Sequence, residues 1–193
     1  RGDALQSSAS LAISAERREL LRYFSRHPNL KKFEPLLKAA GNEFAVDSAL
    51  LKAVMAAESG FDPDATSPKG AIGLMQVMPA TAERYGLRGD DQKTLEEKLS
   101  DPKTNIRLGA RYLRDLQRMF PDQQDLVLAS YNAGEGAVQK YNNTIPPYPE
   151  TRNYVELVTQ IYQWYRPEAA TPRLKANVVS TGAKSKRLSM TIP

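Results

Sequence analysis

The stretch Ala57-Glu58-Ser59-Gly60-Phe61, continued by Ser67-Pro68-Lys69-Gly70-Ala71-Ile72-Gly73-Leu74-Met75-Gln76-Val77-Met78-Pro79, joins an apolar helix to a loop rich in glycine and proline. Asp47 is a natural N-cap for a helix over residues 48–59, and Gly60 is a natural C-terminal cap. Glu58 shares a helix face with Val54 and Met55, because residues three and four apart are neighbours on a helix. The pattern therefore predicts a carboxyl group on a buried face beside a polar loop.

This position should raise the pKa of Glu58. Burial disfavours the charged form of a carboxyl group, and the negative end of the helix dipole has the same effect. A carboxyl group that stays protonated near pH 7 can donate a proton to a leaving group. The chain also supplies polar groups for hydroxyl and acetamido groups and apolar surfaces for sugar faces, namely Ser67, Gln76, Asn132, Met78, Tyr131 and Tyr154. Together these features suggest an acid-catalysed site for a sugar polymer.

Helical periodicity and capping residues predict a mostly α fold for the rest of the chain. Helices are expected over residues 16–26, 35–44, 79–85, 102–120, 123–134 and 150–166, with a loop or short hairpin over 60–80. His27-Pro28 should interrupt the helical pattern, and Pro35 should begin the next helix. The long helix from 102 should turn six residues inward: Ile106, Leu108, Ala110, Leu113, Leu116 and Met119.

Composition excludes several kinds of site. The chain has 193 residues, no cysteine and one histidine, so disulfides, thiolate metal sites and multi-histidine metal sites are ruled out, and neither a metal nor another cofactor is expected. The net charge of +5 favours anionic partners, but the basic residues are scattered and no nucleic-acid-binding motif accompanies them. No stretch approaches the ~20 apolar residues that span a bilayer. The chain begins at Arg1 without a visible signal peptide, which leaves room for a removed targeting segment.

The quoted stretch resembles the signature of the soluble-type (SLT, family 1) lytic murein transglycosylases. Ala129-Ser130-Tyr131-Asn132-Ala133-Gly134 and Glu150-Thr151-Arg152-Asn153-Tyr154-Val155 are similar to two later motifs of that family, in the same order. Ser130 departs from the family pattern, since many relatives carry Ala there. The resemblance implies a goose-lysozyme-like α fold and covers residues 33–166, the expected catalytic domain. Residues 1–32 are expected to form an N-terminal lead-in and helix, and the composition from Pro167 onward predicts a flexible tail over 167–193.

The resemblance also implies an activity. The family cleaves the MurNAc–GlcNAc β-1,4 bond of peptidoglycan without adding water, which leaves a 1,6-anhydro-MurNAc end. On this chain the single acid and base would be Glu58. The expected substrate-binding residues are Ser67, Gln76, Met78, Tyr131, Asn132, Glu150 and Tyr154. A periplasmic or envelope-associated monomer is expected, acting on glycan strands, with envelope-associated proteins as further candidate partners.

Other interpretations stay open from the residues alone. Ser67 before Pro68 could serve only a turn, Met78 could belong to the core, and the two tyrosine rings could pack while their hydroxyls face the site. A lysozyme- or chitinase-like hydrolase would need a second carboxylate directed at water, and no motif supplies one convincingly. A wall-binding assembly protein could keep the fold without catalysis.

Overall fold

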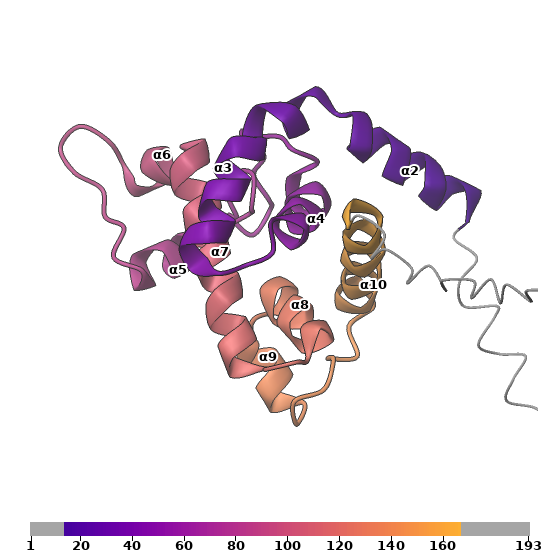
Figure 1. The fold of residues 1–193 in the computed structure, drawn as a ribbon. Coiled ribbons are helices and arrows are strands. Elements are labelled where there is room, and N and C mark those ends of the chain that lie inside the picture. The colour runs from indigo at the N-terminus through magenta and orange to yellow at the C-terminus, as the bar shows by residue number, and fades with distance from the viewer. Residues whose placement is uncertain (1–13, 167–193) are drawn as a thin grey trace, which may run out of the picture.

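Residues 14–166 are described by the computed structural model and form a mostly helical fold, as predicted. The predicted tail over 167–193 and the first part of the lead-in, residues 1–13, lie outside the described part. Figure 1 shows the helices in order: α2 (Ala15–Arg26), α3 (Pro28–Phe44), α4 (Ser48–Ser59), α5 (Pro79–Arg84), α6 (Leu95–Leu99), α7 (Pro102–Met119), α8 (Gln124–Ala133), α9 (Glu135–Lys140) and α10 (Pro149–Tyr165).

Helix α4 lies in the core of the fold. It packs against α10 and α3, while α3 also packs against α7 and α10 also packs against α8. Half of its twelve residues are buried: Leu50, Leu51, Ala53, Val54, Met55 and Ala56. A helix enclosed on this much of its surface is held firmly in position. The end of α4, which carries Glu58, is therefore fixed by the core, whereas α2 lies at the edge of the fold and contacts α3 and α10 (Figure 1).

The start of α3 differs from the prediction. The helix begins at Pro28, and Pro35 lies inside it. Proline suits the first position because no intrahelical partner is needed for its missing N–H. His27 caps this end, since its Nδ1 accepts the Asn29 N–H at 3.2 Å. The sequence pattern placed the boundary one proline too late because it treated His27-Pro28 as a break and overlooked this cap.

Two further expectations were incomplete. The short helix α6 was not predicted, although Thr94 and Glu97 form a reciprocal capping box at its start. Met119, which was expected to face inward, is 43% exposed at the end of α7, and Leu108 is only half-buried. The last turn of α7 keeps Leu116 in the core, while Met119 points away from it.

The predicted loop between α4 and α5 contains no regular strand. Its only pairings in the described structure are isolated bridges from Ile72 to Thr66 and to Val77, which agrees with a loop or minimal hairpin. A buried polar side chain on α7 holds it: Asn105 donates to the Ile72 carbonyl at 2.8 Å and accepts the Met75 N–H at 2.7 Å. Gly73 allows this approach, because a Cβ there would lie 2.6 Å from Asn105 Nδ2.

Replacing Asn105 with Ala should lower the free energy of unfolding by about 3 kcal/mol, because the Met75 N–H and the carbonyls of Ile72 and Leu99 would lose their buried partner. Urea denaturation measures this change. The matched control is Asn153→Ala on the exposed face of α10, which should change stability by less than about 0.5 kcal/mol. Equal effects at both positions would contradict the anchoring role of Asn105.

Candidate active site

The end of α4 is shaped by two consecutive residues in the left-handed region. Gly60 caps the helix with φ of 58°, and Phe61 follows with φ of 65° and a fully buried ring. The sharp turn leads the chain from α4 into the loop. The Ser59 hydroxyl connects α4 to the loop by donating to the Leu74 carbonyl at 2.7 Å. The loop is thus attached directly beside Glu58.

Two predicted site residues have structural tasks within this loop. The Ser67 hydroxyl accepts the Ala71 N–H at 3.0 Å, so this side chain closes a turn. Gln76 adopts a left-handed backbone with φ of 48°, and its amide nitrogen donates to the carbonyls of Ala65 and Gly73 at 3.0 and 2.9 Å. Its side-chain carbonyl oxygen takes no part in these bonds.

Glu58 is half-buried as a residue, and the pKa of its carboxyl group is raised to about 7. Burial is the largest cause, and repulsion from the Glu150 carboxylate adds to it. Interaction with the buried Tyr154 hydroxyl acts in the opposite direction, although these two groups are not aligned as a regular hydrogen bond. The predicted direction of the shift is confirmed, so a large share of Glu58 holds its proton at neutral pH.

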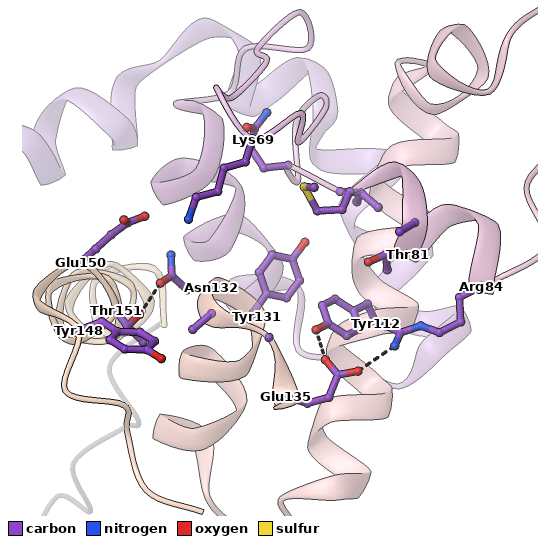
Figure 2. A pocket seen from close by; sticks show the side chains of 16 residues that line it. Lys69, Thr81, Arg84, Tyr112, Tyr131, Asn132, Glu135, Tyr148, Glu150 and Thr151 are labelled. Carbon is purple, nitrogen blue, oxygen red and sulfur yellow. Dashed lines mark hydrogen bonds and ion pairs between the residues drawn. The ribbon is translucent and has the colours of Figure 1, made fainter. Parts of the chain in front are cut away.

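A cavity of about 750 Å³ opens between the loop, α5, α8 and the start of α10 (Figure 2). Five of the eight predicted site residues line it: Gln76, Met78, Tyr131, Asn132 and Glu150. Met78 is 39% exposed, so it belongs to the surface of the cavity and not to the core. Residues from three of the quoted segments, 67–79, 129–134 and 150–155, are thus brought to one cavity.

The other three predicted residues do not line this cavity. Ser67 is engaged in its turn, and the ring of Tyr154 is buried on α10. Glu58 is not among the lining residues, but it lies near Tyr131 and Tyr154, where its charge helps to raise the pKa of both, after burial as the larger cause. Both phenols therefore keep their protons at neutral pH.

Helix α8 supplies the centre of that wall. The Tyr131 hydroxyl donates to the Met75 carbonyl at 2.7 Å, which ties α8 to the loop and leaves the face of its ring toward the cavity. Asn132 accepts the Thr151 hydroxyl at 2.8 Å through Oδ1. Because the amide is planar, this bond directs the NH₂ group of Asn132 away from α10 and into the cavity (Figure 2).

Several lining residues were missed by sequence reasoning. They come mainly from α5, α7 and α9 and include Lys69, Thr81, Arg84, Tyr112, Glu135, Tyr148 and Thr151. Glu135 directly follows the Tyr131–Gly134 motif, which was a usable signal. No such sequence signal marked Arg84 and Tyr112, since only the packing of α5 and α7 brings them to the cavity.

Residues 14–166 contain no group of three or more histidine, cysteine, aspartate or glutamate side chains arranged to hold a metal ion. Over the same range, no helix combines the length and the apolar character needed to cross a membrane.

Comparison with known proteins identifies relatives of this architecture. The membrane-bound lytic murein transglycosylase C of Haemophilus influenzae is 36% identical over 117 residues, which cover 56% of this chain and 33% of that protein. The 70-kDa soluble lytic transglycosylase of Escherichia coli matches 69% of this chain with a TM-score of 0.61 and 30% identity. The corresponding enzyme of Pseudomonas aeruginosa, solved as an inactive glutamate-to-glutamine variant, matches 68% with a TM-score of 0.58 and 32% identity.

The chain spans only a part of these proteins: a third of the Haemophilus protein, 24% of the Escherichia coli chain and 23% of the Pseudomonas chain. The structural matches show that the fold is the lysozyme-like helical fold of these transglycosylases. The family model for the transglycosylase SLT domain matches residues 35–149, more than half of the sequence, and includes Glu58, the loop and the whole of α8. This chain belongs to the family of transglycosylase SLT domains.

Proposed function

We propose that this chain is a lytic transglycosylase that cleaves the MurNAc–GlcNAc β-1,4 bond of peptidoglycan and leaves 1,6-anhydro-MurNAc ends, with Glu58 as both acid and base. The observation that carries the proposal is a carboxyl group whose burial raises its pKa to about 7, near a cavity of about 750 Å³, in an SLT-family domain. An acid of this pKa is available in both protonation states near neutral pH, as a residue that first gives and then takes a proton requires.

The proton transfers balance with one residue. Glu58 donates its proton to the glycosidic oxygen as the bond from C1 of MurNAc breaks, and the 2-acetamido group of the substrate stabilises the positive charge at C1. The Glu58 carboxylate then removes the proton of the C6 hydroxyl while that oxygen bonds to C1. Glu58 ends protonated, as it began, and no water is consumed; such substrate assistance departs from the usual two-carboxylate scheme.

Roles for the surrounding residues follow from their contacts. Asn132 can present its NH₂ group to a sugar hydroxyl or acetamido oxygen, and Met78 and Tyr131 offer apolar surface to sugar rings. Glu150 keeps the pKa of Glu58 high. Ser67 and Tyr154 are proposed to act from behind the cavity lining, where Ser67 shapes the loop and Tyr154 faces Glu58.

The proposal extends to the setting of the protein. We assign the catalytic domain to residues 33–166, flanked by 1–32 and 167–193, and place the protein in the cell envelope, where its substrate lies. A monomer can carry out the reaction because every residue invoked belongs to one chain.

Mass spectrometry of digested peptidoglycan tests the activity. We expect fragments that end in 1,6-anhydro-MurNAc, which are about 18 Da lighter than hydrolysis products because no water is added. Reducing MurNAc ends would instead indicate a hydrolase, with Glu150 as the candidate second carboxylate because it lies close enough to shift the pKa of Glu58. Binding without any cleavage would support a wall-binding protein.

A further inference from the structure

Helix α2 is a basic element that stands outside the catalytic machinery. It ends before residue 35, where the match to the SLT domain begins, and none of its described residues is among those that line the cavity. Residues 15–32 carry six lysines and arginines against two glutamates, a net charge of +4. Residues 33–166 carry fifteen against eighteen acidic residues, a net charge of −3. Within the described part of the chain, the positive charge is therefore concentrated at α2 and the start of α3.

The exposed side of α2 is also apolar. Leu20 and Tyr23 lie three positions apart, so they are neighbours on the helix surface, and they are 36% and 58% exposed. Trp164 is 45% exposed in the last turn of α10, which contacts α2 and whose C-terminal end lies beside α2 in Figure 1. Two of the other three large hydrophobic side chains that are exposed within residues 14–166 line the cavity. The apolar surface outside the cavity thus gathers mainly at α2 and the end of α10.

Arginines stand beside these apolar side chains. Arg22, Tyr23 and Arg26 line one surface hollow of about 510 Å³ at the end of α2. Glu19 lines it too and pairs with Arg22 Nη1 at 2.5 Å, which neutralises part of the charge. The Arg26 side chain makes no hydrogen bond or ion pair with any residue of the described range 14–166. Its guanidinium is therefore available to an anion outside the chain.

An anionic lipid surface matches this combination of groups. Arginines are attracted to lipid phosphates, tyrosine and tryptophan rings favour the level of the headgroups, and a leucine on the same side can enter the acyl region. A hydrated anionic polymer would satisfy the arginines but would leave the exposed apolar side chains in water. We propose that α2, together with the end of α10, is a docking surface for an anionic lipid bilayer. This property goes beyond the proposed reaction, because lipid binding requires neither Glu58 nor the cavity.

Flotation of the 193-residue chain with lipid vesicles tests the docking surface. We expect binding to phosphatidylcholine vesicles that contain about 30% phosphatidylglycerol, little binding to phosphatidylcholine alone, and a loss of binding as salt is added. Trp164 is the only tryptophan of the chain, so it also serves as the reporter. Its fluorescence should shift to shorter wavelength when the ring enters the lipid interface.

Two double variants remove the two parts of the surface separately. Arg22→Gln with Arg26→Gln should weaken binding to the anionic vesicles by at least about tenfold, since each basic residue near such a membrane contributes about fivefold. Leu20→Ser with Tyr23→Ser should weaken it by at least about fivefold and reduce the fluorescence shift, because less apolar surface is buried. All four positions lie on the surface of α2, so the helical circular dichroism and the cleavage of purified peptidoglycan should stay at wild-type level.

The matched controls lie at the ends of α7 and α9, far from α2 in Figure 1. Arg118→Gln with Lys140→Gln removes the same charge from exposed positions, and Met119→Ser removes an exposed apolar side chain. These variants should bind both kinds of vesicle as the wild type does. Residues 167–193 are the same in every variant, so differences arise at the substituted positions.

Three results would overturn the docking surface. The first is equal binding to both kinds of vesicle, and the second is equal binding by the α2 variants and their controls. The third is a loss with the two arginines but none with Leu20 and Tyr23, which would indicate a purely electrostatic contact, as with an anionic wall polymer; sedimentation with isolated peptidoglycan would then show the same dependence on the arginines. None of these results bears on the anhydro products, so the docking surface and the reaction can fail independently.

Discussion

Replacing Glu58 with Gln should reduce the formation of anhydro-MurNAc ends by at least about 10³-fold, since general acid–base catalysis contributes about 10²–10⁴ and here one residue supplies both transfers. Glutamine has nearly the shape of the protonated acid but cannot give up a proton. Because the two side chains have nearly the same shape and Glu58 is not among the residues that line the cavity, binding of glycan strands should change by less than about threefold. The rate is measured by product mass spectrometry and the binding by sedimentation with insoluble peptidoglycan.

The control for this experiment is Glu156→Gln, which makes the same chemical change on the exposed face of α10. It should leave the rate unchanged. If Glu58→Gln and Glu156→Gln retain equal activity, the assignment of Glu58 fails even if the products are anhydro ends, and Glu150 becomes the carboxylate to examine next.

The position of Glu58 could be predicted because all of its determinants are local. The N-cap Asp47, the apolar face of Val54 and Met55, and the stop at Gly60 lie within a short segment, and helix periodicity converts them directly into burial. The structure confirms the helix from residue 48 to 59 and the direction of the pKa shift. The effect of Glu150 could not be foreseen from spacing, since it depends on how α10 packs against α4.

The residues that hold the loop were harder to predict. Asn105 is a polar residue on an otherwise apolar stripe of α7, and such an exception suggests a buried hydrogen bond, but nothing in its surroundings names the partners Ile72 and Met75. The hydrogen bond between Arg84 and Glu135 was equally hard to predict, since the two residues are 51 positions apart. Contacts of this kind are created by the packing of helices, and a single sequence contains no pattern that encodes them.

The raised pKa of Glu58 also predicts a pH-dependent gain of stability in Glu58→Gln. In the unfolded chain the carboxyl group titrates near 4.5, and in the folded protein near 7, so between these values the folded state binds more protons than the unfolded state. The stability of the wild type must therefore fall as the pH rises through this window. The rise from about 4.5 to about 7 corresponds to a loss of about 3 kcal/mol that is complete above pH 7.

Glutamine does not titrate, so Glu58→Gln avoids this loss. At pH 8.5 the variant should be more stable than the wild type by up to about 3 kcal/mol, whereas at pH 4 the two should differ by less than about 1 kcal/mol, because other titrating groups contribute equally to both. Urea denaturation at several pH values measures the difference, and Glu156→Gln should show none. A variant that is less stable than the wild type at pH 8.5 would show that the folded protein favours the ionised carboxylate, which would remove the physical basis for Glu58 as the acid. If the gain is observed, burial of the Glu58 carboxyl group explains both the lower stability of the wild type at high pH and the availability of the catalytic proton. Removing this carboxyl group would then stabilise the domain and abolish the reaction.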